Sequence, residues 1–137
     1  MNFRIFRYLP LLFLLVVVPA HSSDWVFVFE NDDQLMEFDR SSIQPSGEYK
    51  FVRERVTFKN PKDYVTENGA LIKYITIGAL FSCRDRTETL SLVYKYSVDR
   101  KLVSKNEIKG MVERSRPGSV SETILKQVCT ARELGSK

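Results

Sequence analysis

Apolar and polar residues alternate along most of the chain, with the period of two that is typical of half-buried β-strands. Gly, Pro, Asn and Asp residues, which favour turns, divide this pattern into short segments. We therefore expect an α+β fold whose antiparallel sheet has about six strands. They are predicted over residues 25–29, 34–38, 49–58, 71–83, 88–96 and 102–108.

The segments differ in how completely we expect them to be covered. Residues 25–29 (WVFVF) are β-branched or aromatic throughout, which predicts a central strand covered on both faces. Residues 39–47 (DRSSIQPSG) are predicted to be a loop, because Pro45 and Gly47 favour a turn. Residues 60–70 are rich in loop-forming residues and are predicted to form the longest loop.

A helix is predicted near the C-terminus. Ser119 and Glu122 form the S-x-x-E pattern of a capping box, in which each side chain bonds the backbone N–H of the other residue. Apolar residues then recur at one-turn spacing and give the helix one apolar stripe: Ile124, Leu125, Val128 and Cys129. We expect this stripe to cover one face of the sheet.

The N-terminal segment is typical of a signal peptide. Arg4 and Arg7 precede an apolar run from Leu9 to Val18, which is too short to span a bilayer, and small residues follow it. Cleavage is expected after Ala20 or Ser22, so residues 1–22 are the predicted signal peptide and residues 23–134 the predicted domain. The mature protein is expected to be exported, without a transmembrane anchor.

The net charge of the sequence argues against a nucleic-acid partner. The sequence has 21 basic and 17 acidic residues, for a net charge of +4. Removal of Arg4 and Arg7 with the signal peptide leaves 19 basic residues against 17 acidic ones, which is close to neutral. A nucleic-acid-binding protein concentrates its cations on one face, and export removes that partner, so no nucleic acid is expected.

The two cysteines, Cys83 and Cys129, predict one disulfide, because an exported protein folds in an oxidising compartment. The alternative is two free buried thiols. Alternation places Cys83 on the strand face of Ile77, Ala79 and Phe81, and Cys129 lies on the helix stripe. The predicted bond would therefore link the helix to one face of the sheet.

The sequence contains few residue patterns that could support catalysis. The one histidine, His21, lies beside the cleavage site, so a Ser-His-Asp or Cys-His arrangement has no base in the domain. A copper site at His21 would need further nitrogen ligands that the domain lacks. Four carboxylates cluster near residues 31–39, without Ca²⁺-loop spacing, and are interpreted as solvated turn residues: Asp32, Asp33, Glu37 and Asp39. We predict a non-enzymatic protein with no cofactor and no metal site.

One strand face offers a candidate binding surface. Tyr49, Phe51, Arg53 and Arg55 alternate along the strand predicted at residues 49–58 and would present an aromatic and basic strip to a protein partner. The alternative is an ordinary outer sheet face, on which arginine and aromatic side chains pack across strands.

Several landmarks together resemble the surface-adhesin protein E family of bacterial envelope proteins. They are Trp25, the segment 38–43 (FDRSSI), Cys83, the segment 117–119 (PGS) and the pair Val128-Cys129. The resemblance implies an antiparallel sheet with a C-terminal helix held on its face by the disulfide, and a non-enzymatic role. Its founding member is a lipid-anchored adhesin that engages host extracellular-matrix proteins.

This sequence departs from that founding member because no cysteine stands near the cleavage site to carry a lipid. We therefore expect an exported binding protein, periplasmic or secreted, with the cell surface as an alternative location. Its partner is expected to be a host matrix protein or an envelope protein. The alternative function is a soluble periplasmic protein that maintains the envelope and has no host ligand. The sequence leaves the oligomeric state open.

Overall fold

The computed structural model describes residues 22–66 and 68–131. The predicted signal peptide, apart from Ser22, and the residues beyond 131 in the predicted domain lie outside the described residues, as does His21. Within the described ranges, no helix is long and apolar enough to cross a membrane.

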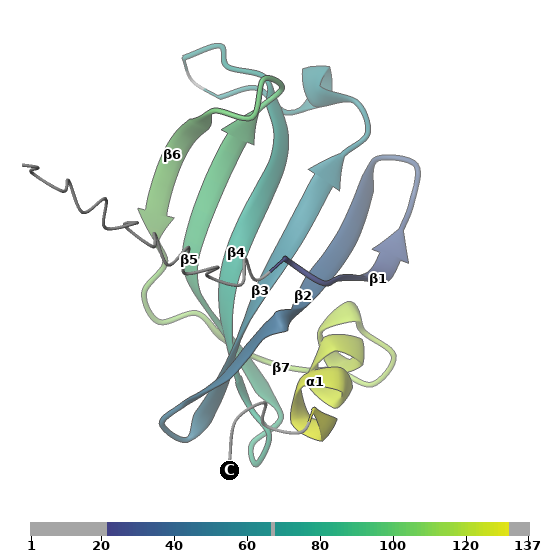
Figure 1. Ribbon diagram of the computed structural model, residues 1–137, viewed down its shortest axis with the longest axis vertical. Helices are drawn as coiled ribbons and strands as arrows, with labels where there is room; N and C mark the ends of the chain where they lie inside the picture. Colours follow the sequence, from purple (N-terminus) through teal and green to yellow (C-terminus); the bar gives the residue numbers. More distant parts are fainter. Residues whose placement is uncertain (1–21, 67, 132–137) are drawn as a thin grey trace, which may run out of the picture.

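One antiparallel sheet and one α-helix make up the fold (Figure 1). The order along the sheet is β1-β2-β3-β4-β5-β6, and β7 pairs with β5 beyond the end of β6. The α+β fold with a C-terminal helix is therefore confirmed. The strands are β1 (Trp25–Glu30), β2 (Gln34–Ser46), β3 (Tyr49–Phe58), β4 (Ile72–Ser82), β5 (Thr87–Ser97), β6 (Leu102–Glu107) and β7 (Val112–Arg114), with the helices η1 (Pro61–Asp63) and α1 (Val120–Thr130).

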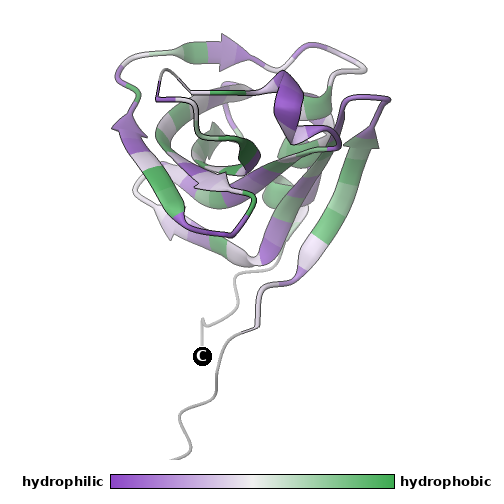
Figure 2. Cartoon of the chain, turned by 90° about the horizontal axis from the view of Figure 1, so that it is seen from above, coloured by the Kyte–Doolittle hydropathy of each residue, from purple (hydrophilic) through white to green (hydrophobic). Residues whose placement is uncertain are grey.

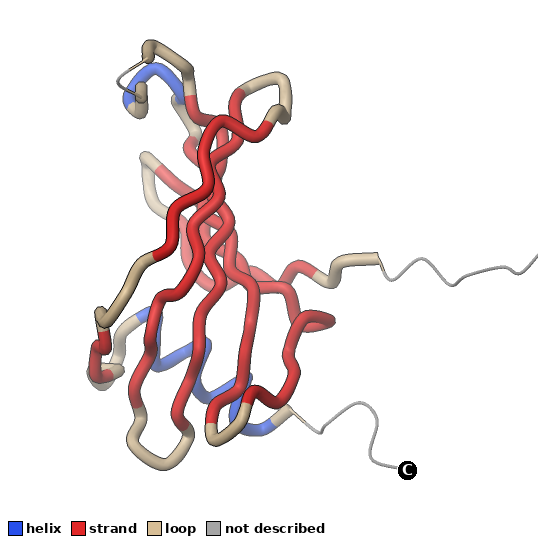
Figure 3. The backbone as a smooth tube through the Cα atoms, turned by 90° about the vertical axis from the view of Figure 1, so that its left-hand side faces the viewer, coloured by secondary structure: helices blue, strands red, loops and turns tan. Residues whose placement is uncertain are grey.

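The sheet is long and strongly twisted. Figure 3 shows the hairpins turning about one another along their length, with η1 and α1 at opposite ends of the sheet. Seen end-on in Figure 2, the sheet curls, and β1 lies at its outer rim as a largely apolar strand. A twisted sheet of this kind has two unlike faces, of which only one is packed against α1.

The prediction that residues 25–29 form a central strand is wrong. Strand β1 is an edge strand, with β2 as its only neighbour in the described sheet. Phe27 is 60% exposed and Phe29 is 37% exposed. An unbroken apolar run predicts a strand, but it does not say whether both faces of that strand are covered.

Two further boundaries differ from the predictions. Residues 39–47 were expected to be a loop, but residues 39–46 continue β2 through an irregularity in its pairing with β3. Strand β7 was not predicted, because three exposed residues give no measurable alternation. The predicted long loop between β3 and β4 is present and contains η1.

The hydrophobic core lies between α1 and one face of the sheet. Val52 of β3, Ala79 and Phe81 of β4 and the helix residues Ile124 and Val128 are fully buried in one cluster. The helix stripe is confirmed, since Ile124, Leu125 and Val128 are its buried residues. Because side chains alternate along β3, Phe51, Arg53 and Arg55 lie on the opposite face.

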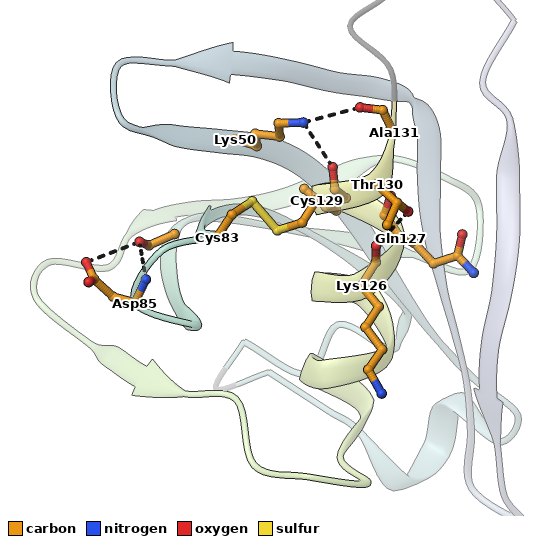
Figure 4. Close-up of a disulfide and its surroundings, with 10 residues drawn as sticks. Lys50, Cys83, Asp85, Lys126, Gln127, Cys129, Thr130 and Ala131 are labelled. Carbon is orange, nitrogen blue, oxygen red and sulfur yellow. Dashed lines mark hydrogen bonds between the residues drawn. A yellow bond between two sulfur atoms is a disulfide. The ribbon is translucent and has the colours of Figure 1, made fainter.

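Backbone groups at both ends of α1 form hydrogen bonds to side chains. The hydroxyl of Ser119 accepts a hydrogen bond from the backbone N–H of Glu122 at 3.1 Å, as the capping pattern predicts. The reciprocal bond differs, because Glu122 accepts from the N–H of Gly118 at 2.8 Å rather than from Ser119. At the other end, Lys50 donates to the carbonyls of Val128 and Ala131 (Figure 4).

Cys83 and Cys129 form the predicted disulfide, with their Cα atoms 5.8 Å apart (Figure 4). The alternative of two free thiols is therefore wrong. Cys83 follows β4 directly and is exposed, whereas Cys129 is half buried on α1. The bond closes at the edge of the core rather than inside it, and it joins α1 to the end of β4.

Candidate ligand-binding face of the sheet

A groove of about 650 Å³ lies on the sheet face opposite α1. We call it the sheet-face groove. Its lining comes from β3, β4 and β5 and from an irregular segment of β2: Ser41, Ser42, Ile43, Gln44, Phe51, Arg53, Thr76, Ile77, Gly78, Leu92, Tyr94 and Tyr96. This volume is within the range of about 300–1,000 Å³ that is typical of small-ligand sites.

The β2 segment that lines the groove is a large bulge. Asp39 pairs with Arg53 and Gln44 with Phe51, so five steps along β2 match only two along β3. The hydroxyl of Ser42 fills the gap in the ladder, since it accepts from the N–H of Arg53 at 2.8 Å. A bulge bends its strand and re-aims its side chains, and here it brings residues 41–44 to the groove.

Asp39 holds this bulge in place. Its carboxylate is fully buried and accepts hydrogen bonds from the N–H groups of Asp24 and Ser41 and from the Arg53 guanidinium. Burial alone would raise the pKa of Asp39, but the hydrogen bonds from Ser41, Arg53 and Asp24 outweigh it, and the net effect is a lowered pKa. Asp39 is therefore ionised at neutral pH.

Trp25 forms a platform beside the groove. The guanidinium carbon of Arg55 lies 4.0 Å from the centre of its ring, and that of Arg53 lies 5.6 Å away. Arg55 also donates to Glu37, with the shorter N–O distance at 2.6 Å. Each arginine is thus held by one carboxylate and one aromatic ring.

Gly78 forms part of the groove floor. A Cβ atom at this position would meet the Phe51 ring at 3.0 Å and the Ser91 hydroxyl at 3.2 Å. The missing side chain therefore lets the Phe51 ring lie directly over β4. The Ser91 hydroxyl donates to the Gly78 carbonyl at 2.8 Å, at a point where the pairing of β4 and β5 is irregular.

Tyrosines line the other end of the groove. Tyr94 and Tyr96 both contribute to its lining. The ring of Tyr96 stacks on that of Tyr74, with 4.7 Å between their centres. Lys105 of β6 lies 5.6 Å from the ring centre of Tyr94. These contacts hold the rings at defined positions on the sheet surface.

The four predicted surface residues do not act as one strip. Phe51 and Arg53 line the groove, whereas Arg55 lies beside Trp25. Tyr49 lies at the start of β3, is 42% exposed and lines a smaller hollow with Glu48, Ser82, Arg84 and Asp85. The charges of Arg53 and Arg55 are both compensated. The candidate site is therefore more aromatic and less basic than the sequence indicated.

Several contributors to the groove were not singled out from the sequence. Tyr94, Tyr96 and Gly78 come from neighbouring strands, and only the sheet register places Gly78 next to Phe51 and the two tyrosines at the other end of the groove. The alternation of Tyr94 and Tyr96 along one predicted strand was a signal that could have located them. The bulge of β2 had no such signal.

The acidic residues near the first hairpin have different roles. Asp32 and Asp33 lie in the exposed turn between β1 and β2, as expected. The interpretation of Glu37 and Asp39 as solvated turn residues is wrong, because both lie within β2 and bind the arginines of β3. Among residues 22–66 and 68–131, no group of three or more His, Cys, Asp or Glu side chains is arranged to hold a metal ion.

A buried acid lies on the other face of the sheet. Glu54 is fully buried between Val52 and Val56 on β3, and neither carboxylate oxygen has a hydrogen-bond partner among the described residues. Burial, together with the charge of Glu88, raises the pKa of Glu54 to about 8. Glu54 interrupts the apolar residues on this face of β3, and it stays in the core.

Comparison with known proteins identifies a family. No curated protein and no solved structure shows a significant match to the chain. A family model described as surface-adhesin protein E matches residues 25–130, from the first residue of β1 to the last residue of α1. The match includes Asp39, the groove and both cysteines. The chain therefore belongs to the surface-adhesin protein E family.

Proposed function

We propose that this protein is an exported, adhesin-like binding protein that contacts a partner protein through the sheet face opposite α1. The observation that carries the proposal is the sheet-face groove. Aromatic rings from β3 and β5 line it together with the bulge of β2, which the contacts of Asp39 fix in place. Aromatic residues and arginine are enriched at protein binding sites, and rigid neighbours reduce the cost of ordering them. Membership of an adhesin family supports the same role.

The proposed role is binding rather than catalysis. Both cysteines are joined in the disulfide, so neither is a free thiol nucleophile. The only histidine of the sequence is His21, beside the predicted cleavage site and outside the described residues. The groove residues are aromatic, amide and hydroxyl groups with two compensated arginine–carboxylate pairs nearby, and this composition favours recognition of a ligand.

The experiment is a capture assay with the mature protein immobilised through its C-terminus. Host extracellular-matrix proteins and a bacterial envelope extract are passed over it separately, and bound proteins are quantified. Phe51→Ala and Tyr94→Ala should each reduce capture at least about tenfold if their rings are central contacts. Tyr64→Ala is the matched aromatic control, because Tyr64 lies in the loop between β3 and β4 and is 41% exposed. Equal capture by all three variants would contradict the proposal.

The source of the captured partner decides between the two cellular roles. Capture of matrix proteins together with protease digestion of the protein on intact cells would support a surface adhesin. Capture of an envelope protein together with protection until osmotic shock would support the periplasmic maintenance role. In both cases the groove variants test the binding site, and the protease experiment tests the location independently.

A further inference from the structure

Most polar side chains of the sheet-face groove are uncharged. Gln44 and Thr76 provide an amide and a hydroxyl, and Tyr94 and Tyr96 provide two phenol groups. Within the part of the chain that the structure describes, none of these four side chains forms a hydrogen bond to the protein. A ligand in the groove therefore meets free donors and acceptors next to aromatic rings.

The groove floor offers side chains but few backbone groups. Strands β3, β4 and β5 each pair with a neighbour on both sides, so their N–H and C=O groups are used in the ladders. At the irregular point the Gly78 carbonyl is taken by Ser91. An extended peptide gains much of its affinity from main-chain bonds to an open strand edge, and the floor strands β3, β4 and β5 present none. The groove favours a ligand that is recognised through side chains.

The charges around the groove cancel. Arg53, the only Lys or Arg among its lining residues, is bound to the buried carboxylate of Asp39. Arg55 is bound to Glu37 beside Trp25. Lys105 lies near Tyr94 but is not part of the lining. The Arg53 charge is already compensated by the Asp39 carboxylate, so the lining offers no unpaired cation to a phosphate, sulfate or carboxylate, and the groove favours an uncharged ligand.

We infer that the sheet-face groove binds uncharged hexose units of a glycan. A hexose ring has an apolar C–H face that fits against the Tyr94, Tyr96 or Phe51 ring, whose negative face attracts polarised C–H groups. Its hydroxyl edge matches the free amide and hydroxyl groups of Gln44 and Thr76. The inference rests on the proposed function and deepens it: the partner protein would be a glycoprotein, recognised through its neutral sugars.

The test is an NMR titration of the isotope-labelled mature protein with three neutral probes, maltotetraose, cellotetraose and tetra-N-acetylchitotetraose. At least one probe should shift the backbone amide signals of groove residues such as Phe51, Gly78 and Leu92. Tyr94→Ala should weaken that binding at least about tenfold. Gln44→Ala keeps every ring and should weaken binding severalfold, which covers the case in which the tyrosine variant does not fold. Tyr64→Ala should leave the affinity unchanged.

A capture experiment separates this inference from the proposed function. Periodate treatment cleaves the vicinal diols of the partner's terminal hexose rings and leaves its peptide bonds intact, so it should abolish capture by the wild-type protein. Capture that needs Phe51 and Tyr94 but survives periodate would overturn the glycan inference and leave the proposed function standing. Groove signals unmoved by all three probes, or moved only by dextran sulfate and lost in high salt, would also overturn the inference. Loss of every groove dependence in capture would instead reject the proposed function.

Discussion

The guanidinium of Arg53 is bound to the carboxylate of Asp39, and this contact fixes the β2 bulge against β3. Asp39 is fully buried, whereas the side chain of Arg53 is 45% exposed. The carboxylate therefore depends on the contact more than the guanidinium does, because water can solvate Arg53 but not Asp39. One pair thus links the segment 38–43, which is one of the landmarks of the family resemblance, to the shape of the groove.

We predict that Asp39→Asn destabilises the protein by about 2 kcal/mol at neutral pH, because the bonds to Arg53 and to two backbone N–H groups are weakened. The lowered pKa of Asp39 sets the direction of the pH effect. Its contribution is present above the ordinary aspartate pKa of about 3.9 and is lost as the pH falls through the lower folded-state value. Urea denaturation at several pH values measures both effects.

Asp24→Asn is the matched control for this substitution. Asp24 forms an ion pair with Arg40 at 2.7 Å, but both side chains are well exposed. Exposed pairs contribute about 0–1 kcal/mol, so this variant should stay close to the wild type. Equal losses from Asp24→Asn and Asp39→Asn would show that Asp39 does not organise the bulge.

A second prediction concerns Glu54, whose pKa is raised to about 8 by burial and by the charge of Glu88. The folded protein holds this proton more tightly than the unfolded chain, in which a glutamate has a pKa of about 4.3. Stability from this group is therefore fully present below about pH 4.3 and is lost as the pH rises through about 8. Denaturation curves from pH 5 to pH 9 should show the loss.

Glu54→Leu tests the cause of that slope. It replaces an unpartnered buried carboxyl with an apolar group, which should stabilise the protein by about 2 kcal/mol at pH 9 and by less at pH 5. Glu113→Leu is a useful comparison, because Glu113 is exposed on β7 and should leave the slope nearly unchanged. A wild-type slope that persists in Glu54→Leu would assign the pH dependence to another group.

The sequence predicted the elements of this fold where its patterns were long. Strand β3 was predicted at its observed bounds, because ten alternating residues carry a clear period. The bulge of β2 was missed, because Pro45 and Gly47 are typical of a loop and nothing local shows that Asp39 and Ser42 bond to β3. The edge position of β1 depends on pairing with distant residues, which periodicity does not report.

The candidate site was predicted only in part for the same reason. Phe51 and Arg53 were found because they alternate along one strand. Their partners, Asp39 and Gly78, lie on β2 and β4 and reach them through the register of the sheet. The charge of Arg53 was visible in the sequence, but its neutralisation was not.

The disulfide gives a third prediction, in which Cys83→Ser or Cys129→Ser lowers the free energy of unfolding by about 2–5 kcal/mol. The two cysteines are 46 residues apart, and closing a loop of that length restricts the unfolded chain. The loss should appear equally in either variant and in the reduced wild-type protein. Denaturation with and without reductant measures it, and equal stability of the oxidised and reduced proteins would show that α1 docks without its covalent link.

A fourth prediction concerns the groove floor at Gly78. A Cβ atom there would lie 3.0 Å from the Phe51 ring, so Gly78→Val should force that ring aside and destabilise the protein by about 2 kcal/mol. The same change should distort the groove and weaken the binding of any ligand that contacts the Phe51 ring.

Phe51→Leu provides the compensating background for Gly78→Val, because the smaller side chain leaves room over β4. The destabilisation by Gly78→Val should fall to less than half of its value in that background, as measured by a double-mutant cycle in urea. Such coupling would locate the cost in the contact between Gly78 and Phe51. An undiminished loss would instead locate it at Ser91, whose hydroxyl lies 3.2 Å from the same Cβ position and donates to the Gly78 carbonyl. The groove would then be shaped by the irregular pairing of β4 and β5, and the Phe51 ring would only rest on it.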